Sequence, residues 1–443
     1  MKKFSQIIVL CTCFFALSCS EDISDLTGVI PDSDTLELDL DNGLGGWGSV
    51  DDDLDVSLAY TECYPWPLDT LYQTPKYYST TNSVEGVEAL IYEPCSYRGA
   101  PKTVFAYYCT PGILAGDRSL DVNLPAMVCL HGGGGEAFSA WVIGWAERGY
   151  AAIAMDLFGK GADSKNVLEN GYNRITIHYA GCLEDDYRED LAYSAICDAV
   201  SANSLLRSFD EIDKTRIGVT GVSWGGVFTS MVCGIDTRFA AAAPVYGCGY
   251  IYEVGSMISY IQPYDYSLYR WSNWYDAAVH IPKADIPILF ANGNKDSHFY
   301  MNQTESSARL AKYPYRSIGY GIKHNQSVGS TLEEVYNFMD YHLMGDEQSE
   351  SPKFIDFKVE DDKLTGSFTT VEKQVTTYFI YTTTEEIDEN ASWARVEITP
   401  GDNNAISVDI LDTYTVYFVS VVYSSDGANY SSEIFFRDDV LFN

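Results

Sequence analysis

Ser223 lies in the stretch GVTGVSWGG, residues 218–226, where glycines surround a serine. The pattern GxSxG occurs by chance in roughly one chain in seven of this length, so the motif decides nothing by itself. Its context is more informative, because Arg216–Thr220 reads as a strand and Val227–Cys233 as a helix. A serine on a sharp strand-to-helix turn exposes its hydroxyl, and the flanking glycines allow close backbone passage. This context predicts that Ser223 is a nucleophile.

A serine hydroxyl reacts poorly at neutral pH, so it needs a base within hydrogen-bond reach and a group that orients the base. For a serine on such a turn the expected chain order is serine, acid, histidine. Asp296 follows the predicted strand Ile286–Ala291 in a polar turn, and Glu253 is the alternative acid. His324 follows the predicted strand Arg316–Gly321 and precedes a helix, which predicts that it is the base.

The chain has six histidines, so the choice of base is small. His298 lies too close to Asp296 in the same turn to be oriented by it easily. His178, His280 and His342 are interpreted as surface or packing residues.

Acyl transfer also requires preorganised donors for the oxyanion of the tetrahedral intermediate. The stretch HGGGG, residues 131–135, follows the predicted strand Ala126–Leu130 and precedes a helix. We expect one N–H from this loop, at Gly133, and a second from Trp224, directly after the serine.

The elements that must position these residues alternate between strand and helix over residues 59–346. This alternation predicts an α/β fold with a doubly wound, mainly parallel sheet covered by helices on both faces. An aromatic-rich insertion at about 250–280 is predicted to cap the pocket, with Trp271 and Trp274 as candidate substrate contacts. The alternative is that these rings pack the cap onto the sheet.

Residues 351–443 differ in character, with short runs rich in Thr, Val, Tyr and Phe between turn signals. The pattern predicts a small all-β sandwich of the fibronectin or immunoglobulin kind, and no cluster in it suggests chemistry.

The first 19 residues combine a basic start, a short apolar run and small residues before Cys19, and resemble a bacterial lipoprotein signal with Cys19 as the lipidation site. A plain secretory signal is the alternative. Residues 20–58 are strongly acidic and glycine-containing, which predicts a flexible tether. We therefore expect an exported lipoprotein of a Gram-negative bacterium, anchored at the outer membrane or cell surface.

The formal net charge is −35, and the chain has no basic cluster, which argues against nucleic acid as a partner. Eleven cysteines occur without the CxxC spacing of zinc or redox sites among those expected in the mature chain. We expect no metal and no cofactor.

The motifs HGGGG, GVSWGG, GNKDSHF and KHN, in this order, resemble those of an α/β-hydrolase. Within that superfamily the segment is similar to the dienelactone hydrolase and acetyl xylan esterase group of exported carbohydrate esterases. The resemblance implies acyl transfer to Ser223 through His324, followed by hydrolysis, on an acylated carbohydrate.

An acetyl esterase acting on a plant-type polysaccharide is the leading functional prediction. A feruloyl or other carbohydrate esterase, a serine peptidase of the same fold, and a non-catalytic glycan-binding lipoprotein remain as alternatives.

Overall fold

The computed structural model describes residues 66–97, 100–162, 188, 190–252, 271–437 and 440–442. The predicted signal with Cys19, the tether, His178, Glu253 and most of the predicted cap lie outside the described residues. In the described part of the chain, no helix combines the length and apolar character needed to cross a membrane.

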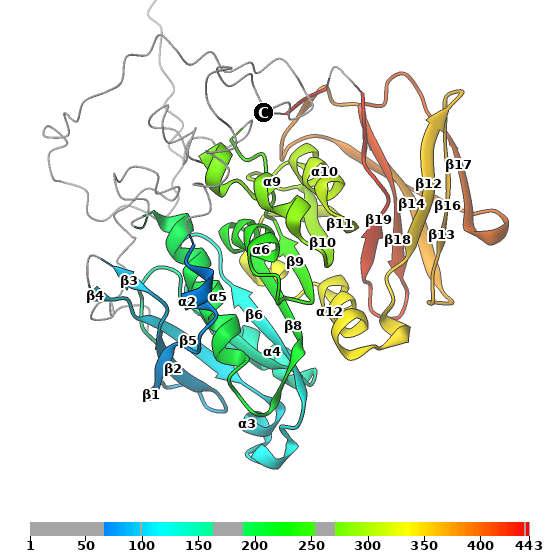
Figure 1. Ribbon diagram of the computed structural model, residues 1–443. Coiled ribbons are helices and arrows are strands. Elements are labelled where there is room, and N and C mark those ends of the chain that lie inside the picture. Colours follow the sequence, from blue (N-terminus) through cyan, green and yellow to red (C-terminus); the bar gives the residue numbers. More distant parts are fainter. Residues whose placement is uncertain are drawn as a thin grey trace, which may run out of the picture. The chain divides into compact units, whose positions relative to one another are not determined.

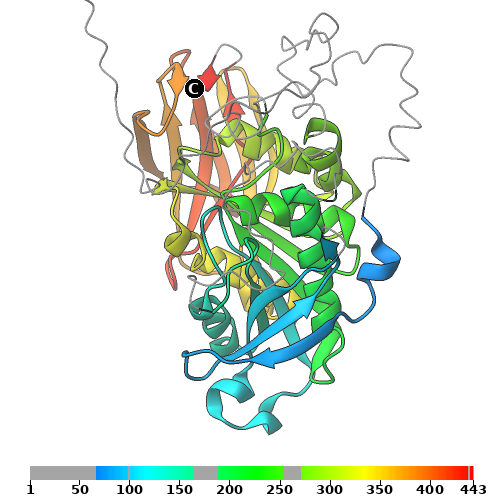
Figure 2. The ribbon, with the colours of Figure 1, turned by 90° about the vertical axis from the view of Figure 1, so that its left-hand side faces the viewer.

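Nine strands form one sheet with the order β1-β2-β5-β7-β6-β8-β9-β10-β11 in the described residues (Figure 1). The strands are β1 (Lys76–Thr80), β2 (Glu88–Glu93), β5 (Val104–Cys109), β6 (Leu124–Leu130), β7 (Ala151–Met155), β8 (Ile212–Val222), β9 (Ala241–Val245), β10 (Pro287–Lys295) and β11 (Tyr313–Lys323). The pairs from β7 to β11 are parallel, whereas β1, β2, β5 and β7 pair antiparallel. Figure 2 shows β1 and β2, in blue, at one end of this sheet. The predicted mainly parallel sheet is confirmed.

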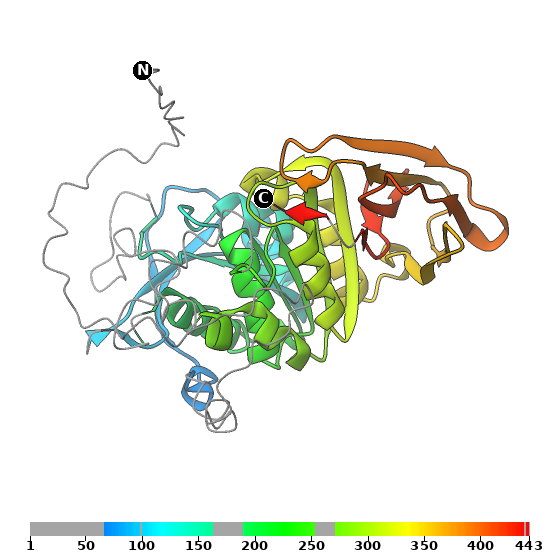
Figure 3. The same cartoon turned by 90° about the horizontal axis from the view of Figure 1, so that it is seen from above.

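Helices cover both sides of the sheet (Figure 3). They are α2 (Leu68–Leu71), α3 (Pro111–Ala115), α4 (Ser139–Glu147), α5 (Leu191–Leu206), α6 (Trp224–Ile235), α9 (Ala277–His280), α10 (Met301–Leu310), α11 (Gln326–Gly329) and α12 (Glu333–Met339). α4 and α12 pack against each other through Trp145 and Tyr336, whose ring centroids are 4.6 Å apart. α5 is bonded to the end of α6 by Asn203, whose amide donates to Asp236 at 2.9 Å.

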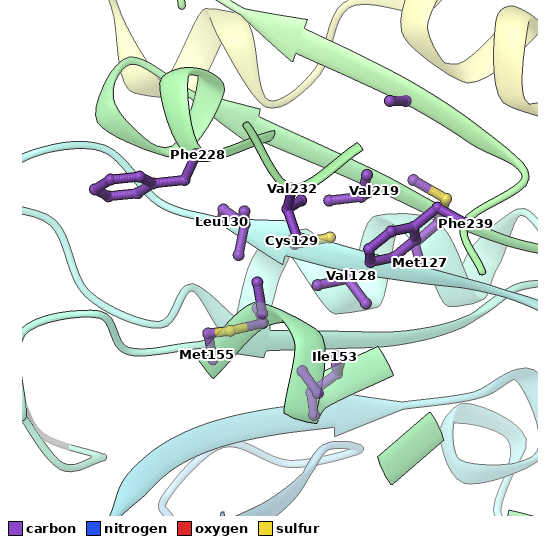
Figure 4. Close-up of a cluster of buried hydrophobic side chains, with 14 of the residues drawn as sticks. Met127, Val128, Cys129, Leu130, Ile153, Met155, Val219, Phe228, Val232 and Phe239 are labelled. Carbon is purple, nitrogen blue, oxygen red and sulfur yellow. The ribbon is translucent and has the colours of Figure 1, made fainter. Parts of the chain in front are cut away.

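The core of the sheet is built around β6, where all seven residues are buried. Figure 4 shows its side chains between those of β7, β8 and α6, including Ile153, Val219 and Val232. A parallel strand with helices on both faces is apolar along its whole length, because neither face meets water. This position explains why the sequence of β6, LPAMVCL, contains no charged residue.

The strands that lead to the predicted acid and base are longer than expected. β10 continues through Lys295, so residues 292–295 belong to the strand rather than to a turn. The polar residues resemble a turn in the sequence, but parallel pairing with β11 extends to Lys323, across a register shift between Gly293 and Lys295. Asp296 therefore lies directly at the strand end.

The C-terminal strands form two antiparallel sheets, as expected for a sandwich. One has the order β12-β13-β17, and the other has the order β16-β14-β18-β19 with β20 paired to β18. The strands are β12 (Lys353–Glu360), β13 (Lys363–Thr369), β14 (Val375–Thr382), β16 (Trp393–Ile398), β17 (Ala405–Asp409), β18 (Val416–Tyr423), β19 (Asn429–Ser431) and β20 (Phe435–Phe436). Two short pairs, β3 (Ser96–Tyr97) with β4 (Ala100–Pro101) and β15 (Glu386–Ile387) with β21 (Leu441–Phe442), complete the strands of the described residues.

The C-terminal strands contact the outer strand of the large sheet, and both belong to one compact unit. The backbone N–H of Ile318 in β11 donates to Ser431 Oγ at 2.9 Å, and the amide of Asn429 donates to Ile318 O at 3.0 Å. These bonds satisfy backbone groups that an edge strand otherwise leaves exposed. Met301 and Ile318 also share a buried apolar cluster with Val416 and Phe418 of the sandwich.

Candidate active site

Ser223 occupies the turn between β8 and α6, with φ 61° and ψ −122°. This backbone conformation is rare for a residue with a side chain, and such strain concentrates at functional sites. The turn is tight because the backbone of α6 approaches β6: a Cβ added to Gly225 would lie 1.9 Å from Leu130 O. Glycine is therefore required at this position, and the serine hydroxyl is presented at the carboxyl edge of the sheet.

The structure brings Ser223, His324 and Asp296 into one hydrogen-bonded chain. His324 Nε2 lies 2.9 Å from Ser223 Oγ, and His324 Nδ1 lies 2.7 Å from Asp296 Oδ2. An ionised carboxylate can only accept, so Nδ1 carries the proton and donates to Asp296. Nε2 of the neutral ring is then the acceptor for the serine O–H, which is the arrangement that a general base requires.

The carboxylate of Asp296 is held by the turn in which it lies. Its Oδ1 accepts from the backbone N–H of His298 at 2.7 Å and of Phe299 at 2.8 Å. The side chain of Asp296 is fully buried, and that of His324 is 17% exposed. The acid is therefore fixed and dry, whereas the base remains accessible from solvent.

Three aromatic side chains lie against the ring of His324, and two of them, His298 and Tyr246, can titrate. His298 stacks on it, with ring centroids 4.5 Å apart and 22° between the planes, and Tyr246 lies 5.2 Å away. Burial, followed by the charge of His324, lowers the pKa of His298, so this ring is neutral near neutral pH. Burial raises the pKa of Tyr246 above its usual value. Neither residue therefore places a charge against the base at neutral pH.

The glycine loop after β6 lies directly beside the serine. A Cβ added to Gly132 would lie 3.0 Å from Ser223 Cβ and 3.1 Å from Gln326 Oε1. The N–H of Gly132 donates to Gln326 Oε1 at 3.1 Å. His131 also fixes the loop, because its Nε2 accepts from Leu157 N–H at 2.9 Å while Nδ1 contacts Gly132 O at 2.8 Å.

Gln326 is a site residue that the sequence analysis missed. It follows His324 by two residues in a polar turn, so the sequence contains no signal that separates it from an ordinary loop residue. Its Nε2 is buried and has no hydrogen-bond partner in the described part of the chain. The N–H of Gly132 is a donor, so the atom of the Gln326 amide that faces it must be the oxygen, and Nε2 points the other way.

The predicted oxyanion donors, Trp224 and Gly133, lie where the glycine loop meets the start of α6. Trp224 is the first residue of α6, where a helix directs its N–H away from its own hydrogen-bond ladder. Gly133 is exposed in the loop, one residue beyond the glycine that contacts Ser223. The roles of Trp224 and Gly133 stay predictions.

Trp271 is not available for the predicted contact with substrate. Its side chain is 0% exposed, and its indole N–H donates to Asp276 Oδ2 at 3.0 Å. It packs edge-on against Trp224, the residue after the nucleophile, with ring centroids 5.7 Å apart. Trp274 is partly buried against the core, and its predicted substrate contact stays a prediction.

Three side chains at the site could ligate a metal ion. Asp296, His298 and His324 have ligand atoms within 4.8 Å of one another. Both carboxylate oxygens and both nitrogens of His324 already take part in the hydrogen bonds described above. The expected absence of a metal stays a prediction.

The other described histidines pack in the interior, as expected. His280 contacts Trp274 O through Nε2 at 2.8 Å, and burial lowers its pKa to about 3. His342 lies against Phe338, and burial lowers its pKa to about 4.

A solved structure with a similar fold is acetyl xylan esterase 1 from Thermoanaerobacterium sp. JW/SL YS485. It has a TM-score of 0.51 and 16% identity, and the match covers 66% of this chain and 93% of that one. The acetyl xylan esterase from Paenibacillus sp. R4 has a TM-score of 0.48 and 17% identity, with coverage of 66% and 96%. A putative dienelactone hydrolase from Klebsiella pneumoniae subsp. pneumoniae MGH 78578 has a TM-score of 0.36 and 16% identity, with coverage of 62% and 93%.

The sheet and the nucleophile turn have the α/β-hydrolase fold. Residues 99–276 match the family model described as acetyl xylan esterase (AXE1), which confirms the resemblance seen in the motifs and the expected enzyme class, a serine carboxylic-ester hydrolase. The matched segment contains Ser223 and ends before Asp296 and His324, whose assignment therefore depends on the geometry above.

Proposed function

We propose that the protein removes acyl groups, acetyl in the first place, from ester positions of a plant-type polysaccharide or oligosaccharide. Ser223 is the nucleophile, His324 the general base and Asp296 the acid that orients the base. The observation that carries this proposal is the continuous hydrogen-bond chain from Ser223 Oγ through both nitrogens of His324 to a buried carboxylate.

In the first half-reaction, Ser223 Oγ attacks the ester carbonyl carbon as His324 Nε2 takes the hydroxyl proton. Backbone N–H groups at the junction of the glycine loop and α6 stabilise the oxyanion that forms. His324 then returns the proton to the departing sugar oxygen. The products are a free carbohydrate hydroxyl and an acyl-enzyme on Ser223.

In the second half-reaction, His324 removes a proton from water, whose oxygen attacks the acyl carbon. The C–O bond to Ser223 breaks, and the serine recovers its proton from the imidazolium. Asp296 stays ionised throughout and stabilises the transient charge on His324. The net reaction is ester plus water giving alcohol plus carboxylic acid.

The resemblance to acetyl xylan esterases supports acetyl as the acyl group and a xylan-type chain as the alcohol. A feruloyl esterase would use the same residues and differ in the acyl pocket. In this proposal Cys19 is lipidated and anchors the enzyme at the cell surface, where a polymeric substrate is met outside the cell.

The test is release of acetate, ferulate and methanol from a panel of plant polysaccharides by the full-length protein. Acetate should be the main product, and Ser223→Ala should abolish its release. Asp296→Asn should lower kcat by roughly 10⁴-fold, because the amide cannot hold the reactive tautomer of the histidine. Acetate release that survives Ser223→Ala would overturn the mechanism.

Asp285→Asn is the matched control for the acid. Asp285 is 73% exposed, pairs with Lys312, and precedes β10 at the end opposite Asp296. Its substitution should leave kcat within twofold of the wild type.

A further inference from the structure

Tyr246 has an unusual backbone conformation beside the catalytic base. It follows β9 directly, and its φ of 49° lies in the left-handed region that favours glycine. Strained backbone of this kind persists where the surrounding structure holds it, and it concentrates at functional sites. The N–H of Tyr246 donates to Ala291 O of β10 at 2.9 Å. The O of Val245, one residue earlier, accepts from the N–H of Ser223 at 2.9 Å. The strained residue is therefore tied both to β10 and to the nucleophile turn.

The side chain of Tyr246 is enclosed between the base and the helix that follows it. Its ring centroid lies 5.2 Å from that of His324, and the residue is 0% exposed. α11 packs closely on the same ring, because a Cβ added to Gly329 would lie 2.7 Å from Tyr246 Cε2. Glycine is therefore required at position 329, and it allows the helix to press the tyrosine ring against its neighbours.

The hydroxyl of Tyr246 does not explain why a tyrosine occupies this position. Its Oη is buried and has no hydrogen-bond partner in the described part of the chain. A buried hydroxyl without a partner costs free energy, and its burial keeps it from a substrate. The feature of Tyr246 that the site uses is therefore the ring.

A second ring, from the turn that holds the catalytic acid, stacks on the base. The ring of His298 lies 4.5 Å from that of His324, centroid to centroid, with 22° between the planes. The backbone N–H of His298 donates to Asp296 Oδ1 at 2.7 Å, so one residue fixes the carboxylate and covers the base. Phe299 adds a third ring, whose centroid is 5.9 Å from that of His324. Rings from two separate loops therefore pack against one imidazole.

The hydrogen bonds of His324 do not by themselves fix its ring. The bond from Nδ1 to Asp296 holds one point, and the torsion that turns a histidine ring is soft. Proton transfer requires Nε2 within hydrogen-bond reach of Ser223 Oγ, and a displacement of about 1 Å can cost roughly 100-fold in rate. Rings packed against the imidazole oppose its rotation, because they would have to move with it.

The need for these rings is greatest in the acyl-enzyme. There Ser223 Oγ is part of an ester and has no proton to donate, so the imidazole keeps only its bond to Asp296. Nε2 must still be in position to take a proton from the water that attacks the acyl carbon. Among the described residues, the packed rings then supply the remaining restraint on the base.

We infer that Tyr246 and His298 are positioning residues for the catalytic base, whose rings keep the imidazole of His324 aligned with Ser223 and Asp296 through both half-reactions. The inference rests on the proposed function, in which His324 is the base, and extends it to two residues that act through the base. Their removal should slow the hydrolysis of the acyl-enzyme more than its formation.

Tyr246→Leu tests the role of the ring, and Tyr246→Phe is the conservative variant that removes only the hydroxyl. Phe105→Leu is the matched control, because Phe105 is also buried and lies in β5, in the other half of the sheet from β9, β10 and β11. Stopped-flow kinetics with p-nitrophenyl acetate separates the burst of p-nitrophenol, which reports acyl-enzyme formation, from the steady-state rate. Circular dichroism measures the unfolding temperature of each variant.

Tyr246→Leu should lower kcat about tenfold and slow the burst by a smaller factor. Tyr246→Phe should keep kcat within twofold of the wild type. Phe105→Leu should lower the unfolding temperature as Tyr246→Leu does, yet leave kcat within twofold.

His298 provides a second pair of variants at a position that is only half-buried. His298→Ala keeps the backbone N–H that holds Asp296 and removes the stacked ring, so kcat should fall about fivefold. His298→Phe restores a ring at this position and should recover most of that loss. This pair decides the question if Tyr246→Leu does not fold.

Three outcomes would overturn the inference. One is an unchanged kcat in both Tyr246→Leu and His298→Ala, and the second is an equal loss in Tyr246→Leu and Tyr246→Phe, which would assign the effect to the hydroxyl. The third is an equal loss of kcat in Phe105→Leu, which would assign it to stability alone. Failure of the proposed function gives a different result, since Ser223→Ala or His324→Ala would then remain active.

Discussion

At the scale of single residues, the acid is positioned independently of the base. Two backbone N–H groups of its own turn hold Asp296 Oδ1, which leaves Oδ2 directed at His324. Loss of the imidazole therefore does not release the carboxylate. A variant at His324 should remove the base and leave the rest of the site in place.

Gln326 allows a test of how the glycine loop is held. Its Oε1 accepts from the N–H of Gly132, next to the nucleophile. Gln326→Ala removes this acceptor, so we expect the loop to move and kcat for p-nitrophenyl acetate to fall about tenfold, less than the roughly 10²–10³-fold loss of a direct oxyanion donor. Steady-state kinetics measures the change.

Gln326→Glu separates the two atoms of the amide. The carboxylate keeps an acceptor for Gly132 and loses the N–H donor. If the loop contact is what matters, kcat should stay within threefold of the wild type. A loss equal to or larger than that of Gln326→Ala would show that the loop contact alone does not explain the role of Gln326, since the variant both removes the Nε2 donor and adds a negative charge beside the nucleophile.

The catalytic residues could be predicted from the sequence, because their order along the chain and the strands before them match those of a serine hydrolase. Ser223, Asp296 and His324 each follow a predicted strand, and the structure brings them together. Gln326 and the packing of Trp271 could not be predicted, since both depend on which side chains meet across the fold. An aromatic residue in the aromatic-rich insertion was interpreted as a substrate contact, whereas the burial of Trp271 depends on the tertiary packing.

At the scale of elements, Asp276 joins segments that are distant in the chain. It caps α9 through Ala278 N–H and accepts from Tyr250 N–H and from the indole of Trp271. It thereby connects the loop that follows β9, through Tyr250, with the segment that contains Trp271. Burial raises its pKa to about 6, although these hydrogen bonds oppose the shift.

This raised pKa predicts the direction of a pH effect on stability. Between about pH 4 and 6 the folded state binds more protons at Asp276 than the unfolded state. The contribution of this proton binding to the free energy of unfolding is therefore complete below pH 4 and is lost as the pH rises through 6. The change is on the order of 3 kcal/mol. Asp276→Asn does not titrate, so its unfolding free energy should fall less than that of the wild type over this range.

Urea unfolding at pH 4, 5, 6 and 7 measures the difference. Asp285→Asn serves as the control. Its free energy of unfolding, plotted against pH, should run parallel to that of the wild type, because the side chain is exposed. Parallel curves for Asp276→Asn as well would contradict the raised pKa.

Most elements of the fold were predictable from periodicity, whereas the ends of some of them were not. Ala151–Met155 and Val375–Thr382 coincide with β7 and β14. The ends of β10 and β11 were wrong, because pairing between neighbouring strands carries the ladder through polar residues that resemble a turn.

At the scale of the whole molecule, the sandwich completes the core of the catalytic part. Phe418 is buried with Met301 and Ile318 in one cluster. Phe418→Ala should destabilise the protein by about 3–5 kcal/mol and lower the unfolding temperature of both parts together. Calorimetry and the thermal loss of esterase activity should report the same shift.

Val396→Ala, on an exposed face of β16, is the control and should change little. Two separate transitions, with esterase activity lost at the wild-type temperature in Phe418→Ala, would contradict a shared core. The contact between the sandwich and β11 could not be predicted from the sequence, since nothing in the sequence distinguishes Ile318 and Ser431 from other strand residues.

The contact between β11 and β19 has a consequence for biosynthesis. Ile318 N–H and Ser431 Oγ are 113 residues apart, and a growing chain produces Ile318 first. Until the later segment emerges, the outer strand of the catalytic sheet is open to pairing with strands of other nascent chains. We therefore expect the protein to be most prone to aggregation while its sandwich is still being synthesised. A chain that ends in this interval would be a fragment with an unpaired, aggregation-prone edge strand.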